Sequence, residues 1–172
     1  MNLRKKLLPL VLTGGIILVD QIVKWAVSKT LPYGRPVQVI GDFLRFTFVQ
    51  NPVLSFSIGR GFGETGRIIL TMVLPMLVVA FVLYYFLAAK DVTQGQRWIL
   101  AAIMGGGLGN QADRYFRPEG VIDFIDFKFY GIFGFERWPV FNVADSTVVV
   151  AGIALLISFL VSGVREKHEQ KS

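Results

Sequence analysis

The sequence predicts an all-α polytopic membrane protein with four transmembrane helices. Hydrophobic residues make up 53% of the 172 residues, and the mean hydropathy is +0.54. Soluble domains contain roughly 45–50% apolar residues. The apolar residues here form long runs with few charges, as expected for segments that cross a bilayer. The length allows one domain, so we expect a single membrane-embedded domain over residues 1–172.

The first two helices are predicted from apolar runs in the N-terminal half. Residues 7–27 are apolar apart from three polar side chains near the end of the run. Residues 68–89 carry no charge, and this uncharged run is long enough to span the hydrocarbon core. Pro75 is expected to kink this second helix.

The third and fourth helices follow in the C-terminal half. The third apolar run, residues 98–112, covers only roughly 22 Å at 1.5 Å per residue. It must therefore include neighbouring polar residues, which gives a helix over 94–114. The fourth helix is predicted over 142–164 and ends before Arg165.

The N-terminus allows a second interpretation, a cleavable signal peptide. Basic residues at 4–6, an apolar run over 7–19 and small residues at 26–28 fit that pattern. Asp20 and Lys24 lie between the apolar run and the cleavage position, which favours a retained transmembrane helix.

Basic residues predict the orientation. Lys and Arg are concentrated in three short segments: before the first helix, between the second and third helices, and after the fourth. The remaining basic residues are spread over long loops. Short basic segments stay on the cytoplasmic side. We therefore expect both termini in the cytoplasm, with the loops 28–67 and 115–139 on the outer face of a bacterial inner membrane.

The two outer loops differ in pattern. Residues 43–49 are β-prone and partly alternating, which predicts a strand or hairpin. Residues 124–130 are rich in aromatic side chains, which is typical of a segment at the membrane interface.

Composition limits the chemistry. The net charge of +6 fits attraction to anionic lipid headgroups, and no basic stripe interleaved with aromatics indicates nucleic-acid binding. Cysteine is absent, and His168, in the polar tail, is the only histidine. Thiolate catalysis and histidine triads are thereby excluded. Catalysis must use carboxylates, Lys, Ser or Tyr, and we expect no metal and no cofactor.

Two polar clusters lie at the outward ends of the third and fourth helices. Asn142 and Asp145 are three residues apart, so they share a helix face. Helix capping is the simpler explanation for them, since Asn and Asp are good N-caps. However, Asp113, Asp123 and Asp126 lie in the preceding stretch, and two close carboxyl groups can share a proton and activate water. Spacing alone leaves open which carboxyl groups form the pair.

Other polar residues have structural explanations. Asp20 and Lys24 are four apart on one helix face, which predicts an ion pair holding the helix in the bundle. A Ser–Lys dyad of Lys24 with Ser55 or Ser57 is a weaker alternative. The glycines at 105–107 and 109 favour close helix packing.

Several motifs together resemble those of the signal peptidase II family, the bacterial lipoprotein signal peptidases. They are Asp20-Gln21-x-x-Lys24, Gly106-Gly107-x-Gly109-Asn110-x-x-Asp113-Arg114, Gly120-Val121-Ile122-Asp123-Phe124, and Trp138-Pro139-x-Phe141-Asn142-x-Ala144-Asp145-Ser146. They occur in the family's order and extend over nearly the whole chain, which makes the resemblance specific.

The resemblance implies an aspartic endopeptidase that removes signal peptides from prolipoproteins by cleaving before a diacylglyceryl-modified cysteine. It implies a catalytic pair of Asp123 and Asp145, thereby choosing Asp123 over Asp126. It also implies four membrane helices with a small β-rich element and a short helical segment on the outer, periplasmic face. The implied partners are a lipid-modified prolipoprotein and membrane lipids, and we expect a monomer.

Further residues receive supporting roles from the same resemblance. The residues implied to bind substrate or support the pair are Asp20, Asn51, Asn110, Arg114 and Asn142. Lys24 and Asp113 are expected to be structural.

One stretch departs from the family pattern Asn-x-Gly-x-Ala-Phe-Ser. Here Val53 replaces the glycine and Ser55 replaces the alanine. Loss of the glycine removes backbone freedom, which bears on the loop shape and on lipid or inhibitor preference rather than on the aspartate pair.

Two other functions fit an intramembrane carboxylate cluster. A small proton-coupled transporter would place its carboxylates near the middle of the membrane, accessible from either side. A non-catalytic membrane assembly factor would need them only for folding.

Overall fold

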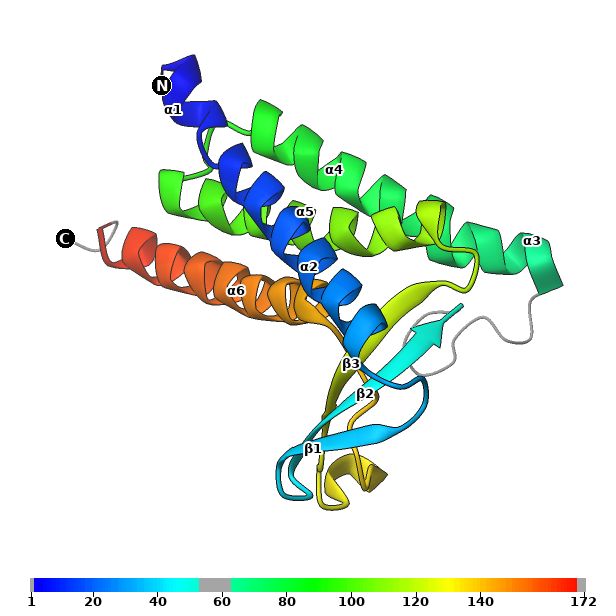
Figure 1. Ribbon diagram of the computed structural model, residues 1–172. Coiled ribbons are helices and arrows are strands. Elements are labelled where there is room, and N and C mark those ends of the chain that lie inside the picture. Colours follow the sequence, from blue (N-terminus) through cyan, green and yellow to red (C-terminus); the bar gives the residue numbers. More distant parts are fainter. Residues whose placement is uncertain (1, 53–62, 170–172) are drawn as a thin grey trace.

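The computed structural model describes residues 2–52 and 63–169 and combines long helices with a small sheet (Figure 1). The helices are α1 (Leu3–Leu7), α2 (Leu10–Thr30), α3 (Gly63–Ile68), the π-helical turn η2 (Ile69–Val73), α4 (Leu74–Ala88), α5 (Gln94–Phe116), the 3₁₀ turn η3 (Ile132–Gly134) and α6 (Val143–Glu169). The strands are β1 (Pro36–Ile40), β2 (Leu44–Asn51) and β3 (Val121–Phe127). The prediction of a mostly helical protein with a small β element is confirmed.

Three helical segments in the described part of the chain are long and apolar enough to cross a membrane. They are Leu3–Thr30, Gly63–Ala88 and Val143–Ser162. The predicted third helix forms α5, which is not among them. Because α5 packs against α2, α4 and α6, several of its glycines and polar side chains are buried, among them Gly105, Gly106, Gly109, Gln111 and Asp113.

The first helix differs slightly from the predicted range 7–27. It is divided into α1 and α2, and α2 begins after Pro9 and continues to Thr30. Proline fits the start of a helix, where its missing N–H is not needed.

The predicted irregularity at Pro75 takes the form of a change in hydrogen bonding. The π-helical turn η2 ends two residues before Pro75. Proline cannot donate to the carbonyl group four residues earlier, that of Thr71. The side chain of Gln111 on α5 donates to this carbonyl group instead, at 2.9 Å.

Glycines on α5 allow close packing, as predicted. A Cβ atom added at Gly106 would lie 2.5 Å from the carbonyl oxygen of Ala144, at the start of α6. One at Gly109 would lie 2.9 Å from Oδ2 of Asp20 on α2. The backbone of α5 therefore lies directly against α2 and α6 at these two glycines.

The three strands form an antiparallel sheet in the order β1-β2-β3. The strand predicted over 43–49 is confirmed as β2. The segment 124–130, interpreted as an interfacial aromatic stretch, instead contributes to β3. Residues 121–124 are all buried, so the apolar alternation typical of a half-exposed strand is missing.

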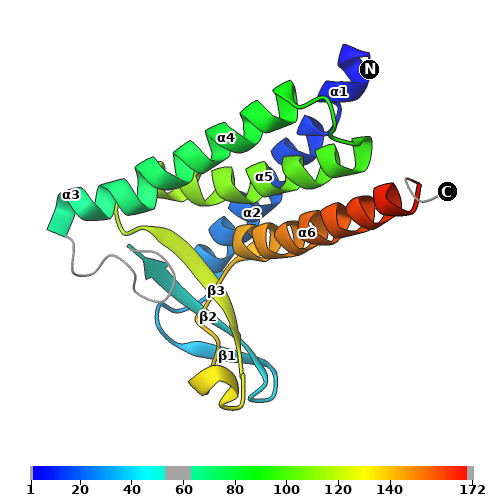
Figure 2. The same cartoon turned by 180° about the vertical axis from the view of Figure 1, so that it is seen from behind.

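The sheet is attached to one end of the helix bundle. Val27 of α2 packs with Phe48 of β2 and with Ile122 and Phe124 of β3. Both views show the sheet extending sideways from this end, while the two termini lie at the opposite end (Figures 1 and 2). Both predicted polar clusters therefore lie at the end that carries the sheet.

Candidate active site

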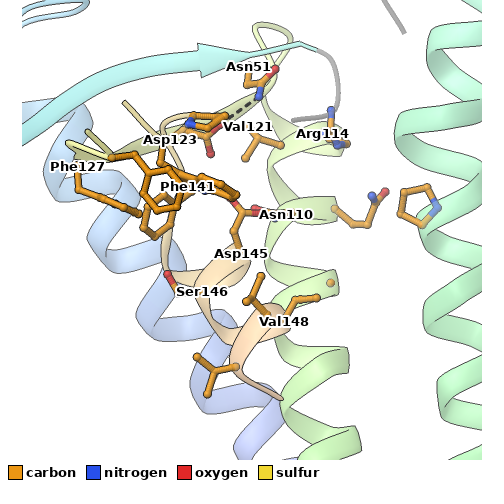
Figure 3. A pocket seen from close by; sticks show the side chains of 18 residues that line it. Asn51, Asn110, Arg114, Val121, Asp123, Phe127, Phe141, Asp145, Ser146 and Val148 are labelled. Carbon is orange, nitrogen blue, oxygen red and sulfur yellow. Dashed lines mark hydrogen bonds between the residues drawn. The ribbon is translucent and has the colours of Figure 1, made fainter. Parts of the chain in front are cut away.

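A cavity of about 720 Å³ lies where the sheet meets α4, α5 and α6. Polar side chains from β2, β3, α5 and α6 line it together with apolar residues (Figure 3). The structure brings five of the sequence-predicted site residues to its wall, namely Asn51, Asn110, Arg114, Asp123 and Asp145. Asn142, a sixth, is fully buried directly behind the wall.

The carboxyl groups of Asp123 and Asp145 are connected through amide side chains. Asn142 Nδ2 donates to Asp123 Oδ1 at 2.7 Å, and the Asn142 backbone N–H donates to Asp145 Oδ2 at 3.2 Å. Asn51 Nδ2 donates to the other oxygen of Asp123 at 3.2 Å. Asn110 Nδ2 donates to Asp145 Oδ1 at 2.7 Å. The described hydrogen bonds to both carboxyl groups thus come from neutral amides.

Asp145 also caps α6. Its Oδ2 accepts from the backbone N–H of Asn142, while Asn142 Oδ1 accepts from the backbone N–H of Asp145 at 2.9 Å. This reciprocal arrangement is a capping box. The capping interpretation from the sequence is therefore correct, and it coexists with the position of Asp145 in the cavity.

Asp123 is only 3% exposed, and its environment disfavours the charged form. Burial, and secondarily the charge of Asp145, raise the pKa of Asp123 to about 7. The hydrogen bonds from Asn51 and Asn142 act in the opposite direction but are weaker. A carboxyl group with this pKa can hold or release a proton near neutral pH.

Lys24 lies behind the cavity in a buried charged cluster. Its Nζ donates to Asp20 and Asp113, both at 2.8 Å, and to Asn110 Oδ1 at 2.9 Å. The ion pair predicted between Asp20 and Lys24 is therefore present. The three protons of the ammonium group match these three acceptors, so Lys24 is unsuited to act as a base. Ser55, a possible partner in a Ser–Lys dyad, lies outside the described residues, as do Val53 and Ser57.

The two aspartates of this cluster fix the elements that carry the cavity carboxyl groups. Asp20 Oδ1 accepts from the backbone N–H of Ala144 at 3.0 Å, in the first turn of α6. Asp113 Oδ2 accepts from the backbone N–H of Ile122 at 3.1 Å, next to Asp123. Negative charge is favourable at the start of a helix. The cluster therefore positions both β3 and α6.

Asp126 lies away from the cavity carboxyl groups. It is three residues from Asp123 on the same strand, so the two side chains point to opposite faces. Asp126 accepts from Thr47 Oγ1 at 2.9 Å and from Arg137 Nε at 2.6 Å.

Sequence reasoning missed Gln111 and Arg117. Gln111 lines the cavity, and Arg117 donates to Asp113 at 2.9 Å. The spacing of four residues between Asp113 and Arg117 was an available signal, whereas the sequence held no signal for Gln111, whose contact with Thr71 depends on helix packing. No group of three metal-ligating side chains occurs within residues 2–52 and 63–169.

The fold and the cavity define a helical multi-pass membrane protein with two close carboxyl groups at one end of its bundle. The family model for signal peptidase (SPase) II matches residues 12–161 of the chain. The chain therefore belongs to the signal peptidase II family, whose members are membrane-bound peptidases of bacteria.

Individual relatives agree with this assignment. The chain is 44% identical to a lipoprotein signal peptidase of Treponema denticola over 171 residues, covering 99% of each chain. It is 39% identical to the Treponema pallidum protein of that name over 158 residues, covering 91% of this chain and 85% of the relative. For the Borreliella burgdorferi protein of that name the identity is 41% over 144 residues, covering 83% and 84%.

Solved structures share the fold. A bacterial membrane enzyme determined at 2.3 Å resolution gives a TM-score of 0.73 at 25% identity, over 94% of this chain and 90% of that chain. A second, determined at 1.9 Å, gives a TM-score of 0.71 at 27% identity, over 92% and 94%.

Proposed function

We propose that this chain is an aspartic endopeptidase that removes signal peptides from prolipoproteins, cleaving before a diacylglyceryl-modified cysteine. The relatives in Treponema and Borreliella carry the name lipoprotein signal peptidase. The observation that carries the proposed mechanism is the pairing of Asp123 with Asp145, linked through Asn142 at the cavity wall.

In the proposed mechanism the two carboxyl groups hold one proton between them. The ionised carboxylate takes a proton from a water molecule, and the water oxygen attacks the scissile carbonyl carbon. The protonated partner hydrogen-bonds to the carbonyl oxygen. Proton transfer to the amide nitrogen then lets the C–N bond break, leaving a carboxylic acid and an amine.

Neighbouring residues have supporting roles in this proposal. Asn51, Asn110 and Asn142 orient the carboxyl groups through the hydrogen bonds described above. Arg114 lines the cavity, where its positive charge favours the charge that develops on the tetrahedral intermediate. Asp20, Lys24 and Asp113 hold the elements that carry the pair.

We further propose that α5 is a fourth membrane crossing. Its 23 residues measure roughly 34 Å at 1.5 Å per residue, comparable to the hydrocarbon core. Because α2, α4 and α6 surround it, α5 needs less apolar surface than a lipid-facing helix. The chain then forms one membrane domain over 1–172, with cytoplasmic termini and the cavity near the outer leaflet.

The substrate enters this cavity from the lipid phase. Val148, Val149 and Val150 of α6 line it, which suits the acyl chains of a lipidated cysteine. The proposal requires no cofactor, metal or nucleic acid, and it treats the protein as a monomer.

The test is cleavage of a diacylglyceryl-cysteine signal peptide by purified protein in lipid nanodiscs, without added metal. Asp123→Asn and Asp145→Asn should each lower kcat/KM by about 10²- to 10⁴-fold. Asp126→Asn is the matched control and should cleave normally, since its side chain faces away from the cavity. Near-normal cleavage by either cavity variant would refute the pair, and inactive wild-type protein would favour a transporter or assembly factor.

A further inference from the structure

Gln111 carries a buried hydrogen-bonding group that the proposed mechanism does not use. Its side chain is on α5, lines the same cavity as Asp123 and Asp145, and belongs to a residue that is 3% exposed. Within the described part of the chain, its Oε1 has no hydrogen-bond partner. A buried acceptor without a donor is destabilising, so this oxygen is a candidate for contact with whatever fills the cavity.

The orientation of this amide follows from Thr71. Pro75 has no N–H to offer the Thr71 carbonyl group, and Gln111 Nε2 supplies the missing donor at 2.9 Å. The opposite orientation would place two acceptor oxygens against each other. The amide oxygen Oε1 is therefore the acceptor that is available to another partner.

The chemistry of an oxygen acceptor limits what that partner is. Ester carbonyls and thioether sulfur of a diacylglyceryl-cysteine accept hydrogen bonds but donate none, so the lipid portion cannot satisfy Oε1. A peptide held open for hydrolysis presents backbone N–H groups that no longer have helical partners. Such an N–H is the complementary group.

Gln111 lies close along α5 to residues that contact the aspartate pair or line the cavity. Asn110, which donates to Asp145, is the adjacent residue, and Arg114 is one turn further along α5. Pro75 lines the cavity on the α4 side. Oε1 itself is covered in this structure, so a substrate N–H reaches it only when the groups around it move aside, while Nε2 keeps its bond to the Thr71 carbonyl group.

We propose that Gln111 Oε1 accepts a hydrogen bond from one backbone N–H of the peptide substrate, on the α4 side of the aspartate pair. Gln111 is then a substrate-positioning residue that distinguishes a peptide from a lipid occupant. This inference rests on the proposed endopeptidase function.

The experiment combines enzyme variants with altered substrates. A series of lipidated signal peptides is prepared in which one backbone amide at a time, on either side of the scissile bond, is replaced by an ester that lacks the N–H. With wild-type protein, the ester at one position should lower kcat/KM by about five- to tenfold more than its neighbours do. Gln111→Leu should show a similar loss with the all-amide peptide and no additional loss with that ester.

A second variant separates substrate contact from folding. Pro75→Ala restores the N–H for the Thr71 carbonyl group, so Gln111→Leu in that background no longer leaves this carbonyl unpaired. The double variant should again show no additional loss with the ester at that one position, whereas Pro75→Ala alone should show the loss. A merely structural role for Gln111 would lower activity toward all peptides equally.

Equal sensitivity of wild-type and Gln111→Leu protein to every ester would overturn the inference. That outcome is distinct from failure of the proposed function, in which wild-type protein would cleave none of the peptides.

Discussion

Two groups of aspartates lie within one end of this molecule, and their surroundings differ. Asp20 and Asp113 share a fully buried lysine, Lys24, whose ammonium group lies 2.8 Å from each. Asp123 and Asp145 receive their described hydrogen bonds from neutral amide groups and border a cavity. Burial raises the pKa of Asp123 to about 7, so this carboxyl group can exchange a proton near neutral pH.

Asn110 connects the two groups. It accepts from Lys24 at 2.9 Å and donates to Asp145 at 2.7 Å. The lysine therefore fixes the orientation of the amide that contacts Asp145. The comparison suggests a division of work, in which one group holds the structure and the other performs chemistry.

Removing the cation should give the largest loss of stability. Lys24→Met leaves Asp20 buried without a counter-charge and Asp113 with Arg117 alone, and breaking a buried pair in this way costs about 3–5 kcal/mol. The free energy of unfolding in detergent micelles measures the effect. Adding Asp20→Asn and Asp113→Asn to the Met variant should recover part of the loss, and an unchanged unfolding midpoint for Lys24→Met would contradict the structural role.

Removing the carboxyl group of Asp123 should instead raise the stability of the folded protein. The pKa of Asp123 is about 7 in the folded protein and 3.8 for an ordinary aspartate. Between about pH 4 and 7 the unfolded chain releases a proton that the folded chain retains, so stability falls as pH rises through this window. Asp123→Asn removes this penalty and should be about 2–4 kcal/mol more stable than wild type at pH 8, with little difference at pH 4.

Unfolding of Asp123→Asn and Asp113→Asn at both pH values tests that contrast. Asp113→Asn is the matched control, because it removes a carboxylate paired with Lys24 and should lose stability at pH 8. If Asp123→Asn were less stable than wild type at pH 8, Asp123 would have a structural role like that of Asp113.

Close packing behind the pair can be tested with glycine variants. A Cβ atom at residue 106 would lie 2.5 Å from the carbonyl oxygen of Ala144, so Gly106→Ala should displace the start of α6 and cost about 1–3 kcal/mol. Because Asp145 is next to Ala144, cleavage should fall by about tenfold to 100-fold. Gly152→Ala on α6 meets no heavy atom within 4 Å and should retain activity; equal behaviour of the two variants would contradict this account.

The smallest effect is expected at Asp126. Its partner Arg137 has a side chain that is 23% exposed, so the ion pair is partly screened by solvent. Asp126→Asn should cost about 1 kcal/mol or less and leave the rate of peptide cleavage within about twofold of wild type. Thermal unfolding and the cleavage assay measure these quantities, and a large loss of cleavage would bring Asp126 into the active group.

Local spacing explains which features the sequence could predict. The Asp20–Lys24 pair and the shared face of Asn142 and Asp145 depend on residues within one helical turn. The second partner of Lys24, Asp113, is 89 residues away, so its contact depends on how α2 packs against α5.

Strand β3 was harder to anticipate, because burial on both faces removes the alternation that identifies a strand. The choice between Asp123 and Asp126 depends on this strand, since residues three apart fall on opposite faces only in extended chain. Gln111 was missed for a similar reason. Its significance depends on the carbonyl group of Thr71, which only the packing of α4 against α5 brings into contact.

The capping box at the start of α6 has a consequence for how much the length of this chain can vary. The backbone N–H and carbonyl groups of Phe141 both form hydrogen bonds with Ile125. This pairing fixes the chain just before Asn142, at the end of the segment 128–140. Insertions or deletions in its outer part, residues 130–136, should leave the cavity intact, because the residues of this segment that line the cavity are Phe129, Trp138 and Pro139. A single residue inserted between Asn142 and Asp145 would instead rotate the carboxyl group about 100° around the helix axis and turn it away from Asp123.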